Sequence, residues 1–213
     1  MNQKQNASKP WQFDLEEYIR QGEAGKAEKS CAWKTAIGLQ DVDGLQTSAY
    51  LLETAKEHIE GYIDIDTARK RIDSYYEIRT ERREEEKGTE EADRVAARIT
   101  QILSEKTFQF SPAEYRMIHK RLFFGIYDHA GMARTYNITK KEWVLHGKSV
   151  FYASADSINA TLEYDFGQEK QFSYKGLSLQ ESVRHLAKFT SDIWQIHPFC
   201  EGNVTQRHSQ KAA

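Results

Sequence analysis

Along most of the chain, apolar residues recur at intervals of three and four, the spacing that gathers them on one face of an α-helix. In the first half this spacing predicts four helices, and the turn residues Asp41–Gly44 separate the second from the third. Either Asp64 or Asp66 is placed to cap the fourth helix. The alternating charges that follow are expected to form its solvated end before Gly88. The predicted helices cover residues 11–20, 26–40, 48–63 and 67–87.

The periodicity continues after Gly88, and several of the predicted helices there have clear starting signals. Thr89 is expected to cap the first, and Ser111 with Glu114 forms a capping box for the second. A second capping box opens the last helix at Ser178. These helices are predicted over residues 89–106, 111–131, 155–166 and 178–196. The side chains expected to face a core are Ala68, Ile72, Tyr75, Tyr76, Ile78, Ala92, Val95, Ala96, Ile99, Ile102, Leu103, Met117, Ile118, Leu122, Phe123, Ile126, Leu179, Val183, Leu186, Phe189, Ile193 and Ile196.

One segment departs from the helical pattern. Residues 136–154 are rich in β-branched and aromatic side chains, which favour extended strands. His146–Lys148 forms a turn signal between two short runs of such residues. The sequence therefore predicts a mainly α fold that carries one small β-hairpin.

Composition and charge narrow the class of protein. The formal net charge of −2 argues against a nucleic-acid-binding surface, and no apolar run approaches the length of a membrane span. The N-terminus lacks the apolar core of a signal peptide, and two cysteines do not make a disulfide framework. We therefore expect a cytoplasmic protein that binds neither nucleic acid nor membrane.

The stretch His197-Pro198-Phe199-Cys200-Glu201-Gly202-Asn203 holds the most concentrated chemistry of the chain. Pro198 should end the preceding helix, which leaves His197 at a buried helix's exit, where it is expected to face solvent as a general base. Phe199 is expected to plug into the core, Glu201 offers a hard oxygen ligand for Mg²⁺, and Gly202 with Asn203 suits an anion cradle. Taken by themselves, these residues are also explained by an ordinary helix cap followed by a turn.

The stretch resembles the signature of the Fic family, which runs His-Pro-Phe-any-Asp/Glu-Gly-Asn-Gly/Thr-Arg. Residues 115–142 are similar to the segment that leads into the Fic flap, and residues 144–158 are similar to the flap hairpin and the next helix. The helix over residues 181–199 then delivers the motif, so the resemblance covers residues 89–203 in order and spacing. Residues 36–66 look like the helical antitoxin-type annex that often precedes such cores.

The resemblance implies a Fic-type helical bundle with a β-hairpin flap that moves AMP from ATP, with Mg²⁺, onto a Ser, Thr or Tyr hydroxyl of a protein target. His197 would be the base, Phe199 the buried anchor and Glu201 the ligand of the nucleotide-bound Mg²⁺. Gly202 and Asn203 would line the phosphate cradle; a homo-oligomer is left open. The flap that would clamp the target by strand addition comprises Trp143, Val144, Leu145, His146, Gly147, Lys148, Ser149, Val150, Phe151 and Tyr152. Its other interpretation is a surface hairpin without a partner.

The sequence departs from the family pattern directly after Asn203. Val204 and Thr205 stand where the pattern has Gly or Thr and then Arg, and Arg207 is out of register. We therefore expect a core truncated or frame-shifted within the motif and little AMP transfer, because threonine lacks the charge and the donor geometry of arginine. The alternative is a non-catalytic interaction or regulatory protein, or a truncated remnant, that binds a partner through annex and flap. The expected divisions are a loose N-terminus (1–10), the annex (11–87), the incomplete core (88–203) and an aberrant polar tail (204–213).

Overall fold

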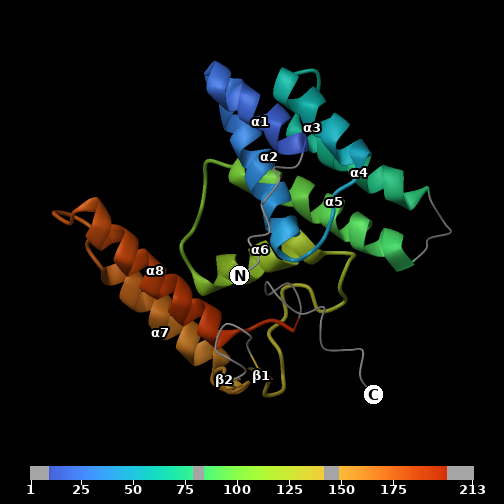
Figure 1. Ribbon diagram of the computed structural model, residues 1–213. Helices are drawn as coiled ribbons and strands as arrows, with labels where there is room; N and C mark the ends of the chain where they lie inside the picture. Colours follow the sequence, from blue (N-terminus) through green and yellow to red (C-terminus); the bar gives the residue numbers. More distant parts are fainter. Residues whose placement is uncertain (1–9, 79–83, 142–148, 201–213) are drawn as a thin grey trace, which may run out of the picture. The chain divides into compact units, whose positions relative to one another are not determined.

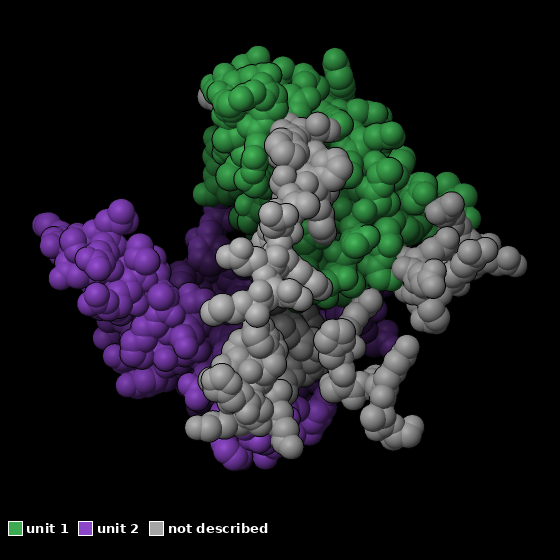
Figure 2. Space-filling view, viewed as in Figure 1, with its two compact units in different colours: residues 1–106 green, residues 107–213 purple. Residues whose placement is uncertain are grey.

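The structure is a computed structural model that describes residues 10–78, 84–141 and 149–200. It divides into two compact units, Met1–Lys106 and Thr107–Ala213, which Figure 2 colours separately. Among the described residues the fold is mainly α-helical, as the sequence predicts (Figure 1). No helix in the described ranges is long and apolar enough to cross a membrane.

Unit 1 is a bundle of helices in which α2 packs against α1, α3 and α5, while α4 packs against α3 and α5 (Figure 1). Trp33 and Ile37 of α2, Leu51 and Ile59 of α3 and Ile72 of α4 are buried in its core. The helices are α1 (Pro10–Gln21), α2 (Ala24–Val42), α3 (Ala49–Glu60), α4 (Ile65–Glu77) and α5 (Glu84–Leu103).

A buried carboxylate ties three of these helices together. Asp93 of α5 accepts hydrogen bonds from the backbone N–H of Ser48 at 2.8 Å and from the hydroxyl of Tyr76 at 2.7 Å. Ser48 is the N-cap of α3, and its own hydroxyl also donates to Asp93. Burial raises the pKa of Asp93 despite these donors. The start of α3 is thereby fixed to α4 and α5.

Unit 2 is built on the helical hairpin of α7 (Ile158–Gln171) and α8 (Leu179–Ile196), which lie side by side in Figure 1. Its core gathers Ile158, Leu162 and Phe166 from α7 with Ile193 and Ile196 from α8. The unit also contains α6 (Pro112–Phe123), β1 (Thr139–Lys141) and β2 (Ser149–Phe151). The strands pair antiparallel, with Thr139 opposite Phe151, in the segment where the sequence predicts a hairpin.

The predicted helix boundary at Gly88 is wrong. Helix α4 ends at Glu77, and α5 begins at Glu84 and runs through both Gly88 and Thr89. A glycine inside a helix costs only about 1 kcal/mol, which the packing of α5 against α2 and α4 outweighs. The two compact units divide after Lys106, and the boundary between annex and core that the sequence placed after Lys87 stays a prediction.

Other predicted boundaries need smaller corrections. The helix expected over 111–131 ends at Phe123, and Gly125 follows with a positive φ of 74°. The helix expected over 155–166 starts later and runs to Gln171. Asp64, rather than Asp66, caps α4 by accepting from the backbone N–H of Thr67 at 2.7 Å.

The predicted apolar faces are only partly buried. Ala68, Ile72, Tyr76, Ala92, Val95 and Ala96 lie in the interior, as expected. The first half of α8 is different, since its apolar side chains Leu179, Val183 and Leu186 are exposed to solvent. On α6, Met117 is exposed and His119 takes the buried position. The predicted core residues found exposed are Ile78, Leu103, Met117, Leu179, Val183 and Leu186.

Candidate functional site

Helix α8 carries the histidine of the motif to its C-terminal end. At the other end of the helix Ser178 and Glu181 form a complete capping box, which fixes where the helix starts. The helix ends at Ile196, as Pro198 predicts, and His197 adopts the left-handed conformation with φ 48° and ψ 63°. Among the described residues it is the one non-glycine position with positive φ. Such a conformation costs about 1–2 kcal/mol, so the surrounding contacts must hold it in place.

Arg134 supplies those contacts. Its side chain is 2% exposed, and its Nε donates to the carbonyl of His197 at 2.9 Å. One terminal nitrogen donates to the carbonyls of Ile196 at 3.2 Å and of Ala153, and the other donates to the carbonyl of Tyr136 at 2.7 Å. The backbone N–H of Arg134 donates to the carbonyl of Pro198 at 2.8 Å. A single guanidinium therefore joins the end of α8 to the segment that follows β2.

The imidazole of His197 is enclosed. Only 1% of the residue is exposed, which corrects the expectation that it faces solvent. The ring centroid lies 4.4 Å from that of Tyr152 and 6.4 Å from that of Trp194, whose ring is nearly perpendicular to the imidazole. Tyr152 directly follows β2 and belongs to the predicted flap, so the structure brings the end of the flap and the histidine of the motif together.

Phe199 lies against α6. It is 2% exposed, and its ring stacks on that of His119 at 3.7 Å, with Tyr115 at 5.3 Å. His119 Nδ1 in turn accepts a hydrogen bond from the backbone N–H of Gly131 at 2.8 Å. This aromatic stack holds the chain after His197 in place, as Arg134 holds the chain at the end of α8.

Several predicted site residues lie outside the described residues. They are the expected Mg²⁺ ligand Glu201, the cradle residues Gly202 and Asn203, and the flap residues Trp143, Val144, Leu145, His146, Gly147 and Lys148. The described part of the flap consists of Ser149, Val150, Phe151 and Tyr152, of which the first three form β2. Phe151 is 75% exposed, so this end of the hairpin presents a large apolar side chain to solvent.

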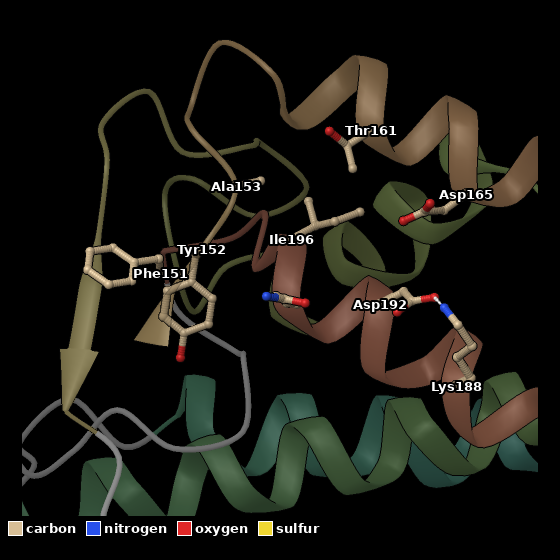
Figure 3. A pocket seen from close by; sticks show the side chains of 9 residues that line it. Phe151, Tyr152, Ala153, Thr161, Asp165, Lys188, Asp192 and Ile196 are labelled. Carbon is tan, nitrogen blue, oxygen red and sulfur yellow. Dashed lines mark hydrogen bonds and ion pairs between the residues drawn. The ribbon is translucent and has the colours of Figure 1, made fainter. Parts of the chain in front are cut away.

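Beside the flap lies an open cavity of about 480 Å³ (Figure 3). It is lined by the residues at and after the end of β2, by Asp165 on α7 and by Lys188 and Asp192 on α8. Burial raises the pKa of Asp165, and the nearby Asp192 carboxylate raises it further. Neither this cavity nor Arg134 was predicted, because no local motif marks side chains that meet only after the hairpin, α7 and α8 have packed.

Comparison with protein families finds a match within unit 2. Residues 109–206 match the model of the Fic/DOC family, a range that contains α6, the β-hairpin, α7, α8 and the His197 motif. No curated protein and no solved structure matches the chain. The annex lies outside the matched range.

Proposed function

We propose that this chain, which belongs to the Fic/DOC family through residues 109–206, is built on the plan of a protein adenylyltransferase that joins AMP from ATP to a protein hydroxyl. One observation supports the placement of this chemistry: Tyr152 at the end of the flap lies against His197, with ring centroids 4.4 Å apart. A target strand paired with the flap would therefore present its hydroxyl close to a base.

In the proposed reaction the target oxygen bonds to the α-phosphorus of ATP, and pyrophosphate leaves. His197 accepts the proton of the attacking hydroxyl at a ring nitrogen. Because the imidazole is 1% exposed, a neighbouring group must move before the hydroxyl reaches it. Arg134 does not contact the reactants; it is a positioning residue, since its guanidinium is occupied by backbone carbonyls that include that of His197.

Mg²⁺ would offset charge on the α- and β-phosphates, and Glu201 is the residue proposed to hold it. The guanidinium of Arg134 contacts the backbone of His197 but is occupied by carbonyls, so it is not proposed to bind the triphosphate. The anion would thus depend on the residues after Phe199, where Thr205 replaces the arginine of the family pattern.

We therefore propose that the chain as given transfers little AMP and that Thr205→Arg raises the rate. A charge-assisted hydrogen bond contributes roughly 1.5–3 kcal/mol, which corresponds to a gain of about 10- to 100-fold. The assay incubates the protein with Mg²⁺, a cell lysate and ATP labelled on its α-phosphate. Gln206→Arg is the matched control, because it adds the same charge one position out of register. His197→Ala in the Thr205→Arg background should abolish labelling.

The second candidate is a non-catalytic interaction protein, and two observations favour it: the enclosed imidazole and the threonine at position 205. Mg-ATP separates the candidates. A rise in melting temperature with Mg-ATP, greater in Thr205→Arg than in Gln206→Arg, supports the transferase plan. If Mg-ATP has no effect on either variant and neither one labels protein, the interaction function stands. Strong labelling by the unmodified chain that His197→Ala abolishes would refute the proposed low activity.

A further inference from the structure

The cavity beside the flap has a chemical character of its own. Apolar side chains of Ile196 and of the residues around Tyr152 line one part of it, Thr161 and Gln195 add neutral polar groups, and another part carries charge from both helices (Figure 3). Asp165 comes from α7, whereas Lys188 and Asp192 come from α8. A cavity with an apolar part and a charged part suits a ligand with an apolar stem and a polar end.

The charges of this cavity do not balance. Lys188 Nζ lies 2.5 Å from the carboxylate of Asp192, so these two groups neutralise each other within α8. Asp165 is left as the surplus negative charge, and no described residue donates a hydrogen bond to its carboxylate. The pKa of Asp165 is raised, because loss of solvent and the Asp192 carboxylate disfavour its ionised form more than the Lys188 ammonium favours it. A bound cation would offset both effects, because its charge stabilises the ionised carboxylate.

The cavity is also continuous with the strand that presents the target. Phe151 is the last residue of β2 and lines the cavity together with the two residues that follow. Among the described strands β1 pairs with one edge of β2, and no described strand pairs with the other edge. A polypeptide paired along that edge places every second side chain on the same face. One of these side chains would then be placed at the mouth of the cavity, which Phe151 lines.

We propose that this cavity binds the lysine or arginine side chain of a target polypeptide that lies along β2. The aliphatic stem packs on the apolar part, and the cationic group pairs with Asp165. This inference rests on the proposed function, since it takes the flap as the site of the target, and it adds the preferred chemistry of that target.

The test measures peptide binding without nucleotide. The probe is a fluorescein-labelled, end-blocked nonapeptide of alternating threonine and valine with lysine at its centre. Its partner probe has norleucine there, which keeps most of the stem and removes the charge. Fluorescence anisotropy should show at least 10-fold tighter binding of the lysine peptide. Asp165→Asn should reduce that preference to less than 2-fold, while Glu163→Gln, on the exposed side of the same helix, should leave it unchanged.

The outcomes separate this inference from the proposed function. Equal affinity for the two peptides, absence of binding, or a preference that survives Asp165→Asn overturns the inference. A preference that Glu163→Gln reduces as much as Asp165→Asn also overturns it, because general attraction to an acidic helix would then suffice. A preference that depends on Asp165 in a chain that never transfers AMP, even with Thr205→Arg, supports the cavity and refutes the transferase plan.

Discussion

Replacement of Arg134 by methionine tests the main structural argument about the site. Methionine keeps most of the apolar volume of the arginine stem and removes every donor. The carbonyls of His197, Ile196 and Ala153 would lose their partner in a buried position, whereas Tyr136 is exposed and its carbonyl can bind water. Each unsatisfied buried carbonyl costs about 1–3 kcal/mol, and the desolvation cost of the guanidinium is recovered. We expect a loss of about 3–5 kcal/mol in the free energy of unfolding of unit 2.

The assay combines urea denaturation with hydrogen exchange. Denaturation gives the loss of free energy, and exchange shows where protection is lost. Peptides that contain residues 150–156 and 194–200 should exchange faster, while peptides from α2 should not change. Arg184→Met on the exposed face of α8 is the matched control and should cost less than about 0.5 kcal/mol. A cost below 1 kcal/mol for Arg134→Met, with protection around His197 intact, would show that the left-handed turn does not depend on the guanidinium.

Two further predictions concern backbone space and charge. Gly131→Ala should destabilise the protein by about 2 kcal/mol, because Gly131 has φ 81° and a methyl group there would stand 2.7 Å from Cβ of Lys120. Gly167→Ala in α7 should stabilise the protein slightly, because the added methyl group has no atom within 4 Å. Urea denaturation of both variants measures the two changes in the free energy of unfolding. Asp165→Asn should raise the melting temperature at pH 7, since the pKa of Asp165 is raised in the folded state and its ionised form therefore opposes folding. That gain should disappear as the pH falls below the ordinary pKa of an aspartate, where the native carboxyl is also neutral; a gain that persists at low pH, or an equal one from Glu163→Gln, would contradict the electrostatic cause.

Local patterns predicted the helices because each of them depends on residues close in sequence. The capping box of Ser178 with Glu181 and the stop at Pro198 are both found where the sequence places them. The boundary predicted at Gly88 was wrong because the preference of glycine for a helix end is weak, and packing between helices distant in sequence outweighs it. The predicted burial of Leu179 was wrong because a periodic pattern shows that a helix face is apolar, but not whether another element covers that face.

The candidate site divides in the same way. His197 and Phe199 were identified because they belong to one short motif. Arg134 and Asp165 could not be found from their neighbours, since each acquires its surroundings only through elements far away in the sequence. The enclosure of the imidazole was likewise not predictable, because it depends on Tyr152, which precedes α7 in the sequence and is 45 residues away from His197.

The reach of Arg134 has a consequence for how the site assembles. Its hydrogen bond to the carbonyl of Ala153 closes a loop of 19 residues, whereas its bond to His197 closes one of 63. Closing the 63-residue loop costs more chain entropy than closing the 19-residue loop, so it is expected to form later. The segments that flank the hairpin can therefore gather around the guanidinium while α8 is still being synthesised, and the histidine joins last. In refolding experiments the quenching of Trp194 by its neighbours should belong to a slower phase than the recovery of helical circular dichroism.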